Sequence, residues 1–306
     1  MELIYLNSLS NKYVADLVVT IGQFDGVHLA HIALINKVKE IAKAKNLKSG
    51  LMTFNPHPDF ILKKQTDETY ITPLDEKIEF LKKFDLDYLF IVTFNREVAQ
   101  LEPKLYVDSY LTAIGVKEVV VGFDFHYGLA GKGSGKTIKT DSNNKIAVTI
   151  IDEIKYQNEK MGSTLIRELL ANGNPREVTN ILGRPYQISA KVVRGMQIGS
   201  KIGIPTANLE INDAFVMVKP GVYAVKVSYL NEEFAGICNI GHNPSFNYKE
   251  NLTMEVHIIG FSGDLYGKII SVSFIEYLRP EIKFATINDF KKQITDDIAK
   301  ANQLVK

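Results

Sequence analysis

The sequence lacks several features that would assign the chain to a specialised class of protein. Its 306 residues include no tryptophan and a single cysteine, Cys238, which excludes an internal disulfide. A single cysteine is compatible with a reducing compartment, so we expect a cytoplasmic protein. The sequence has no apolar run of about 20 residues and no basic start, so we expect neither a membrane-spanning helix nor a signal peptide.

An excess of charge of one sign is also missing. The 36 lysine and arginine side chains nearly balance 35 acidic ones, which gives a formal net charge of +1. We therefore expect neither nucleic acid nor a membrane as a partner, and the composition does not specify an oligomeric state. The chain length exceeds what one hydrophobic core normally serves, so two domains are expected.

The first part of the chain, residues 1–182, alternates apolar runs with stretches of helical periodicity. The runs are rich in β-branched residues, as in strands buried on both faces, and they cover residues 18–21, 50–54, 88–93, 119–122 and 146–151. Helices are expected at 32–42, at 72–84 with Thr72 as N-cap, at 96–114 with a bend at Pro103, and at 165–171. Strands separated by helices predict an α/β domain with a parallel sheet.

The second part, residues 183–306, has a different pattern. Short runs of alternating apolar and polar residues follow one another between turns, at 186–193, 222–229, 233–240, 252–259 and 268–278. Regular short strands of this kind predict an antiparallel β-barrel or sandwich. Residues 286–304 predict an amphipathic helix, which Thr286 caps and whose apolar face comprises Phe290, Ile294, Ile298 and Ala301.

Residues 18–31 are the most informative stretch. A buried strand ends at Gly22, a turn follows, and helical spacing begins after the turn. His28 and His31 are therefore expected at the start of a helix, where free N–H groups and the helix dipole favour a bound phosphate. Two imidazoles three residues apart can both donate hydrogen bonds to such a phosphate. The stretch therefore predicts a nucleotide phosphate site.

Two further strand ends carry polar or aromatic side chains. Asn55 and His57 follow the second predicted strand, and Asp124 and Phe125 follow the fourth. Ligands bind at the carboxyl edge of a parallel sheet, where Asp124 could accept a hydrogen bond from a ribose or flavin hydroxyl. Other interpretations stay open at this point. The histidine pair could be ordinary turn residues, His57 could be structural or bind a metal with Asp25, and the aromatic loop could simply pack on the sheet.

The start of the helix predicted at 165–171 also suggests phosphate binding. Ser163 and Thr164 precede it, so free N–H groups near them can meet a phosphate, and Arg167 lies one turn further on. Helix capping alone explains the two hydroxyl groups but does not explain the arginine.

Residues 131–137 have some likeness to a Walker A phosphate-binding loop. Ala130 stands where that motif needs a glycine, and the polar residues that follow predict a turn rather than a helix. We therefore expect a mobile loop and no P-loop.

In the second part, residues 195–208 are the strongest signal. Their three glycines let the backbone approach a ligand closely, and Thr206 and Asn208 supply oxygen atoms suited to Mg²⁺. The spacing of the glycines alone is weak evidence for a ligand-binding loop.

The strand predicted at 252–259 carries a carboxylate. Its alternation places Glu255 on one face with Thr253 and His257, which fits a solvated face as well as a catalytic role. Arg279, after the last strand, could face a flavin or a phosphate, or be an ordinary surface charge.

These motifs resemble those of prokaryotic FAD synthetases, which are bifunctional riboflavin kinase/FMN adenylyltransferases. In the first part the resemblance rests on Gly22-x-Phe24-Asp25-Gly26-x-His28-x-x-His31, Phe54-Asn55-Pro56-His57-Pro58, Gly122-Phe123-Asp124-Phe125 and Ser163-Thr164-Leu165-Ile166-Arg167. In the second part it rests on the glycine-rich loop with an intact Pro205-Thr206-Ala207-Asn208, and on the segments around Asn239, Glu255 and Arg279.

The resemblance implies a Rossmann-like nucleotidyltransferase domain over residues 1–182 and an antiparallel riboflavin kinase barrel with a C-terminal helix over 183–306. It implies ATP as co-substrate, Mg²⁺ as cofactor, and riboflavin, FMN and FAD as substrates and products. Glu255 would be the catalytic base of the kinase, while His28, His31 and Arg167 would stabilise the leaving pyrophosphate. The residues expected to bind ATP or flavin are Gly22, Phe24, Asp25, Gly26, Asn55, His57, Asp124, Phe125, Ser163, Thr164, Gly195, Gly199, Lys201, Gly203, Pro205, Thr206, Ala207, Asn208, Asn239 and Arg279, of which Thr206 and Asn208 would also hold the metal.

Two residues depart from the family pattern. Ala30 stands where the family has a glycine that lets the nucleotide approach the backbone, and Ser200 replaces an arginine near the kinase loop. The sequence therefore leaves two further hypotheses open. One is a family member with a single working activity, in which adenylylation is the more affected step. The other is a non-catalytic regulator that binds flavin or nucleotide.

Overall fold

The structure is a computed structural model that describes residues 1–7, 9–62, 68–195, 203–211, 214–242 and 252–305. The chain divides into two compact units, Met1–Gly162 and Ser163–Lys306, and each is described by itself. The domain limits expected from the sequence, after residue 182, remain a prediction. Among the described residues, no helix is both long enough and apolar enough to cross a lipid bilayer.

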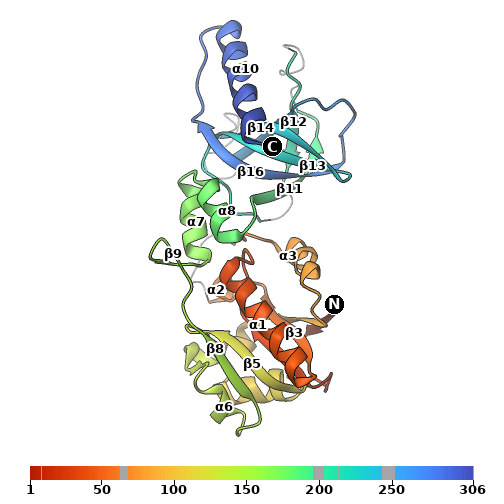
Figure 1. The fold of residues 1–306 in the computed structure, drawn as a ribbon, viewed down its shortest axis with the longest axis vertical. Coiled ribbons are helices and arrows are strands. Elements are labelled where there is room, and N and C mark those ends of the chain that lie inside the picture. Colours follow the sequence, from red (N-terminus) through yellow and green to blue (C-terminus); the bar gives the residue numbers. More distant parts are fainter. Residues whose placement is uncertain (8, 63–67, 196–202, 212–213, 243–251, 306) are drawn as a thin grey trace. The chain divides into compact units, whose positions relative to one another are not determined.

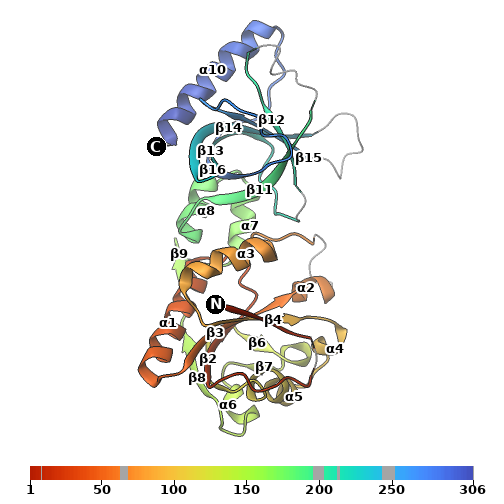
Figure 2. The same cartoon turned by 90° about the vertical axis from the view of Figure 1, so that its right-hand side faces the viewer.

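The first unit is built on six parallel strands in the order β1-β4-β3-β2-β5-β8 (Figures 1 and 2). Their bounds are β1 (Glu2–Leu6), β2 (Leu17–Ile21), β3 (Lys48–Asn55), β4 (Tyr88–Thr93), β5 (Val116–Gly122) and β8 (Ala147–Ile151). All five predicted strands are confirmed. β1 was not predicted, although it contains a short apolar run at residues 3–6, and it is a largely exposed edge strand. The strand order reverses between β2 and β5, and ligands of open α/β sheets bind at the carboxyl ends of strands at such a point.

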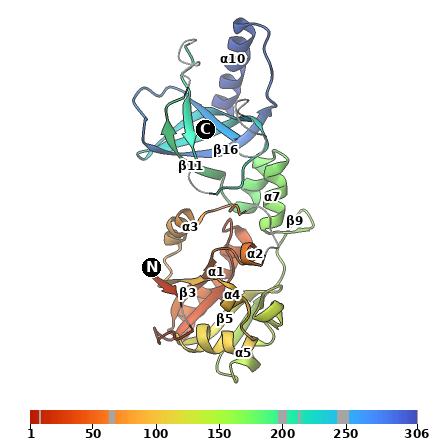
Figure 3. The same ribbon diagram turned by 180° about the vertical axis from the view of Figure 1, so that it is seen from behind.

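Helices cover both faces of this sheet (Figures 1 and 3). Side chains alternate along the strands, so Val18 and Val120 join the apolar cluster under α1 (Leu29–Lys45) and α3 (Leu74–Leu81), whereas Val19 joins the cluster on the other face. Because both faces are covered, the central strands carry consecutive apolar residues, such as Val18-Val19 and Val119-Val120-Val121, as the sequence predicted.

Shorter elements complete the first unit. They are α2 (Pro58–Ile61), η1 (Lys82–Phe84), α4 (Arg96–Ala99), α5 (Pro103–Tyr106), the π-helical turn η2 (Val107–Thr112), η3 (Leu129–Gly131), α6 (Ile138–Asp141), and the paired strands β6 (His126–Tyr127) with β7 (Gly133–Ser134) and β9 (Lys155–Tyr156) with β10 (Glu159–Lys160). The helix predicted over 96–114 is broken rather than bent, because Pro103 begins a new helix. The predicted cap at Thr72 is wrong by one residue: Pro73 occupies the cap position, and the Thr72 N–H donates to Asp25.

The second unit begins with α7 (Ser163–Ala171) and α8 (Pro175–Leu182), which lead into a closed antiparallel barrel (Figure 2). In barrel order the strands are β11 (Tyr186–Val193), β12 (Ala207–Glu210), β15 (Leu252–Ile258), β14 (Glu232–His242), β13 (Gly221–Tyr229) and β16 (Ile269–Arg279). The prediction of an antiparallel fold is confirmed, and the fold is a barrel rather than a sandwich. The four residues of β12 were not predicted as a strand, because such a short segment shows little alternation.

Helix α10 (Ile287–Leu304) packs on the outer face of the barrel. The predicted cap is confirmed, since Thr286 Oγ1 accepts a hydrogen bond from the Asp289 N–H at 3.1 Å. The predicted apolar face is also confirmed, because it clusters with Ala224 and Ile237 of the barrel wall.

Candidate active sites

At the carboxyl end of β2, the turn that starts at Gly22 leads into α1 and brings two histidines together. His28 is the N-cap of α1, and its Nδ1 accepts a hydrogen bond from the His31 backbone N–H at 3.4 Å. The two rings stack with their centroids 3.6 Å apart and their planes at 18°. Because Nδ1 of His28 is an acceptor, the neutral ring carries its proton on Nε2, which can donate to an anion. The predicted position of the pair at the helix start is confirmed.

Phe24 and Asp25 shape this turn from inside the protein. Both side chains are buried, and Asp25 Oδ1 accepts hydrogen bonds from the N–H groups of Ile71 and Thr72 at 2.9 and 3.1 Å. Gly26 has a φ of 84°, a left-handed conformation that favours glycine. Because the ring and the carboxylate are buried, a ligand at this turn would have to contact its backbone. Ligand contacts of these residues stay a prediction.

A buried lysine lies behind the histidines. Lys77 of α3 is 1% exposed, and its Nζ donates a hydrogen bond to the carbonyl oxygen of Gln23 at 2.8 Å. Burial lowers the pKa of Lys77 to about 8, although the nearby Asp25 carboxylate raises it. Burial, together with the charges of His28 and Lys77, holds the pKa of His31 well below its ordinary value. His31 is therefore neutral at neutral pH, so it can interact with an anion by hydrogen bonding rather than as a cation.

The segment after β3 places His57 in an aromatic cluster. The Asn55–Pro56 peptide bond is cis, and His57 is the N-cap of α2, with its Nδ1 accepting from the Asp59 N–H at 3.1 Å. Its ring centroid lies 5.2 Å from that of Phe60. Within the described ranges, no three His, Cys, Asp or Glu side chains are grouped so that they could hold a metal. The alternative of a metal site with Asp25 is therefore not supported.

The loop after β5 carries Asp124 and Phe125. The Asp124 carboxylate is ion-paired with Lys160 of β10, whose ammonium group also lies 5.4 Å from the centre of the Phe123 ring. Phe125 stacks on Tyr127 with a centroid distance of 5.8 Å. Asp124 thus has a partner that the sequence did not predict. Its proposed hydrogen bond to a substrate hydroxyl stays a prediction.

Residues 131–137 lie in a folded hairpin rather than the mobile loop that was expected. β6 pairs with β7, and the Thr137 hydroxyl accepts a hydrogen bond from the Ser134 N–H at 3.0 Å. The following segment opens with one helical turn, α6, where the sequence predicted a turn without helix. Because the Thr137 hydroxyl is used within the hairpin, the structure gives no support to a P-loop.

Three of the predicted site residues lie in α7 of the second unit. Ser163 and Thr164 are the first residues of this helix, and Arg167 follows in the next turn. The helix therefore starts two residues before the predicted position of Leu165, and the two hydroxyl groups lie within its first turn. A phosphate site that combines these residues with His28 stays a prediction.

In the barrel, strand register places several predicted residues in one row. Each residue of this row is directly opposite the next one on the neighbouring strand. The row runs around the barrel wall through Asn208 on β12, Glu255 on β15, Asn239 on β14, Val222 on β13 and Arg279 on β16. Directly opposite residues of antiparallel strands project from the same face, so the four polar residues of this row and Val222 lie on one face of the barrel wall.

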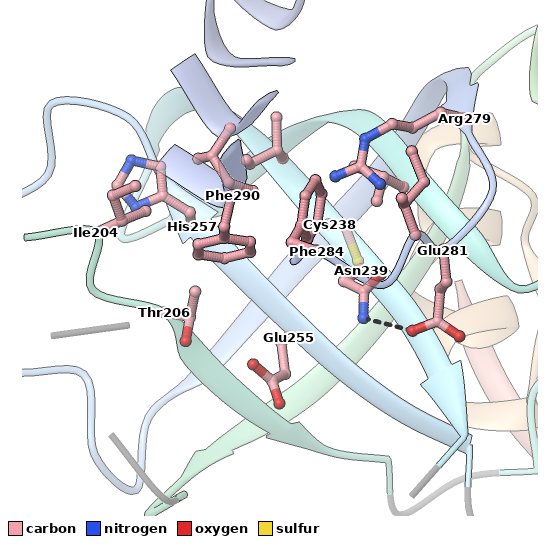
Figure 4. Close-up of a pocket in the computed structure, with 14 residues that line it drawn as sticks. Ile204, Thr206, Cys238, Asn239, Glu255, His257, Arg279, Glu281, Phe284 and Phe290 are labelled. Carbon is pink, nitrogen blue, oxygen red and sulfur yellow. Dashed lines mark hydrogen bonds between the residues drawn. The ribbon is translucent and has the colours of Figure 1, made fainter. Parts of the chain in front are cut away.

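This row borders a pocket of about 320 Å³ between the barrel wall and α10 (Figure 4). Its lining includes Thr206, Glu255 and the aromatic rings of Phe284 and Phe290. Asn239 Nδ2 donates to Glu281 Oε1 at 3.2 Å at the edge of the pocket. A pocket of this size with mostly apolar walls and a few polar groups is typical of small-molecule sites. Glu255 therefore faces a pocket rather than open solvent.

The glycine-rich loop is described only at its two ends. Gly199 and Lys201 lie outside the described residues, as does Ser200. Gly195 is so close to Asn208 that a Cβ at this position would lie 2.2 Å from the Asn208 Nδ2 atom, so a larger residue would displace the amide. Gly203 belongs to the segment that leads into β12.

The residues that enter β12 supply oxygen ligands beside Glu255. Thr206 and Asn208 alternate with Ala207 along the extended chain, so both lie on the face of Glu255, which is opposite Asn208. The Pro205 carbonyl lies 2.8 Å from Nδ1 of His257 and fixes the approach to the strand. Hydroxyl, amide and carboxylate oxygens are the donors that Mg²⁺ prefers, so this set fits the predicted metal.

Arg279 is held by α10. Its Nε and Nη2 atoms each lie 2.9 Å from Oδ2 of Asp297, which is fully buried, and Gln293 donates to the other carboxylate oxygen at 3.0 Å. A β-bulge at Leu278 precedes Arg279 and sets its direction. The guanidinium thus ties α10 to the pocket border, while its contact with flavin or phosphate stays a prediction.

Sequence reasoning missed two buried charges, Lys77 and Asp297. Both occupy core positions in amphipathic patterns, one in the apolar spacing of residues 74–81 and the other in that of residues 294–301. A charged residue at such a position is a signal, because an isolated charge is costly to bury and needs a nearby partner. The aromatic pocket residues Phe284 and Phe290 carried no such signal.

Comparisons with known proteins agree with this arrangement. A family model of FAD synthetase matches residues 10–165, and one of riboflavin kinase matches residues 182–305. A bifunctional riboflavin kinase/FMN adenylyltransferase of Bacillus subtilis is 38% identical over 287 residues, covering 93% of this chain and 91% of that protein. The protein of the same name from Listeria monocytogenes is 36% identical, covering 92% and 90%. A solved structure from Streptococcus pneumoniae, described as a macrolide-efflux protein, has a TM-score of 0.91, with 28% identity over 98% of both chains.

The parallel sheet with its histidine pair and the closed barrel with its pocket define a protein that joins a nucleotidyltransferase-like domain to a riboflavin kinase fold. The chain belongs to the family of bifunctional riboflavin kinase/FMN adenylyltransferases, which are enzymes of flavin cofactor biosynthesis. The resemblance stated from the motifs is thereby confirmed, and the changes at Ala30 and Ser200 do not remove it. The description as a macrolide-efflux protein applies to the Streptococcus pneumoniae structure and is not carried over to this chain.

Proposed function

We propose that this chain converts riboflavin to FAD in two ATP-dependent steps, one in each domain. The barrel phosphorylates riboflavin to FMN, and the α/β domain adenylylates FMN. Two observations support the proposal: the histidine pair lies at the reversal point of the sheet, and the row of residues around Glu255 borders the barrel pocket.

In the kinase step, Glu255 accepts the proton of the riboflavin 5′-hydroxyl while that oxygen attacks the γ-phosphorus of ATP. The bond between the γ-phosphorus and the ADP oxygen breaks, which gives FMN and ADP. The rings of Phe284 and Phe290 suit the flat flavin ring system. Thr206 and Asn208 would hold Mg²⁺ beside Glu255, and the ion when bound screens the phosphate charges.

In the adenylyl step, a phosphate oxygen of FMN attacks the α-phosphorus of ATP, and the bond to the pyrophosphate oxygen breaks. This reaction needs no covalent intermediate with the protein, so positioning and hydrogen bonding supply the catalysis. His28 and His31 donate hydrogen bonds to the phosphates, and Arg167 supplies positive charge. Nδ1 of His31 is buried without a hydrogen-bond partner in the described part of the chain, so the proposed hydrogen bond to phosphate is assigned to the other ring nitrogen.

The remaining predicted residues line these two sites in the proposal. The nucleotide and flavin of the adenylyl step would be bound by Gly22, Phe24, Asp25, Gly26, Asn55, His57, Asp124, Phe125, Ser163 and Thr164. Those of the kinase step would be bound by Gly195, Gly199, Lys201, Gly203, Pro205, Ala207, Asn239 and Arg279. The proposal includes a cytoplasmic location, where ATP is available. It also includes a requirement for Mg²⁺, so excess EDTA is expected to stop both steps and added MgCl₂ to restore them.

The proposal is tested by a time course of the purified protein with riboflavin, ATP and MgCl₂, in which chromatography separates the three flavins. The reaction is repeated from FMN and with dithionite-reduced flavin. FAD that forms through transient FMN supports both steps. FMN that accumulates without FAD in either redox state contradicts the adenylyl step and directs attention to Ala30. FAD from FMN with no product from riboflavin contradicts the kinase step and directs attention to Ser200.

A further inference from the structure

A wholly buried lysine connects α3 to the turn that carries the histidine pair. Lys77 is 1% exposed, and its ammonium donates a hydrogen bond to the Gln23 carbonyl at 2.8 Å, across 54 positions of the sequence. The Thr53 hydroxyl donates to the same carbonyl at 2.9 Å. Lysine is almost never fully buried without such partners. Gln23 is therefore held from two neighbouring elements, near the start of the turn.

The turn itself needs to be held. Phe24 and Val27, both wholly buried, have φ angles of 52° and 39°, in the left-handed region that side chains rarely adopt. Strained conformations of this kind persist only where surrounding contacts determine them, and they gather at functional sites. Only one residue separates this strained segment from the start of α1, so a change in the turn moves His28 and His31 directly.

A second set of hydrogen bonds connects the turn to the segment that leads into α3. The Asp25 carboxylate accepts hydrogen bonds from the N–H groups of Ile71 and Thr72, which lead into α3. Asp25 and Lys77 carry opposite charges and interact favourably, so the buried ammonium is compensated. The turn and the α3 segment are thus connected at two points, through the negatively charged Asp25 and the positively charged Lys77.

Lys77 also sets the electrostatic surroundings of the histidines. The titratable groups that act on His31 are His28 and Lys77, and both disfavour a proton on the His31 ring. Burial is the main reason why the His31 ring stays neutral, and the charges of His28 and Lys77 add to this effect. The lysine cannot itself contact a phosphate, because it is buried.

We propose that Lys77 is a positioning residue for adenylyl transfer: from α3 it holds the Gln23 carbonyl and thereby sets the turn that presents His28 and His31 to the phosphates of ATP. This proposal rests on the proposed adenylyltransferase activity. The kinase reaction of the same chain is independent of it, because the barrel residues belong to the second unit.

The test compares Lys77→Met, which keeps the length and apolar stem of the side chain, with Lys83→Met, an exposed lysine that follows α3. We expect FAD formation from FMN to fall roughly 10–100-fold in Lys77→Met, because a small displacement of positioning groups has effects of this order. FMN formation from riboflavin should stay within about twofold, since separate sites act independently. Lys83→Met should leave both reactions unchanged.

A pH profile of FAD formation separates positioning from a loss of folded protein. Removing the charge of Lys77 lets His31 gain a proton more easily, so the acid limb of the profile should move to higher pH in Lys77→Met. The folded fraction of each variant, measured by circular dichroism at every pH, corrects the profile for loss of folded protein. An unmoved acid limb, unchanged FAD formation, or an equal loss of kinase activity would each overturn the proposal. Wild-type protein that makes no FAD from FMN would overturn the adenylyltransferase function itself, and the role of Lys77 with it.

Discussion

The ion pair between Arg279 and Asp297 gives a quantitative prediction for the barrel. The Asp297 side chain is fully buried and that of Arg279 is 12% exposed, so neither charge is well solvated. Removing one member of such a pair typically costs about 3–5 kcal/mol, because the other charge stays buried. For a unit of this size that corresponds to a fall in melting temperature of roughly 6–20 °C. We expect Asp297→Asn to show this shift.

The assay is thermal unfolding of the full chain followed by circular dichroism, together with the riboflavin KM of the kinase reaction. The KM should rise, because α10 carries Phe290 and Ile294 of the pocket lining and loses one attachment to the barrel. Asp296→Asn is the matched control, since Asp296 is the exposed neighbour on the same helix.

A double variant tests whether the loss of stability comes from the unpaired buried charge. Replacing both Arg279 and Asp297 by leucine removes the two charges together, so most of the lost stability should return. If Asp297→Asn unfolds within about 1 °C of Asp296→Asn, the pair does not hold α10 and the argument is refuted.

Three further predictions concern the two reactions. Glu255→Gln should lower FMN formation by about 10²–10⁴-fold, and FAD formation from FMN should persist; equal loss of both would contradict the assignment of Glu255. Ala30→Gly should lower the stability of α1 by about 0.5–1 kcal/mol with little change in FAD formation, whereas a clear fall in the KM for ATP would mean that the methyl group obstructs the nucleotide. Folding lowers the pKa of His31, so below about pH 6.5 the unfolded state binds a proton that the folded state does not. Stability present at pH 7 should therefore be lost on acidification by up to about 1.4 kcal/mol per pH unit. Urea unfolding between pH 5 and 8 measures this slope, and His31→Asn should reduce it.

Much of the fold could be predicted because local patterns specify it. The apolar run at 18–21, its terminating glycine and the helical spacing that follows placed β2, the turn and α1 correctly. β12 could not be predicted in the same way, since four residues carry little periodicity and pair through contacts with strands far along the chain. The helix predicted over 96–114 failed for a local reason, because Pro103 starts a new helix instead of bending an existing one.

In the candidate sites, too, local motifs could be predicted, whereas contacts between distant residues could not. Motifs identified His28, His31 and Glu255, and the structure places the two histidines at the start of α1 and Glu255 at the barrel pocket. The partners of these residues depend on tertiary structure. Lys77 and Asp297 are buried charges whose hydrogen-bond partners lie 54 and 18 positions away in the chain, at distances that no local pattern records.

The row of opposed residues around the barrel has a consequence for how this domain can change. Side chains alternate between the two faces of a strand, so a shift of one position in β15 would turn Glu255 into the barrel interior and bring Met254 to the pocket. The pairing register of β15 therefore determines whether the general base, Glu255, faces the pocket. Insertions and deletions can accumulate only between the strands, and a single-residue deletion within β15 should abolish phosphorylation even where the barrel still closes.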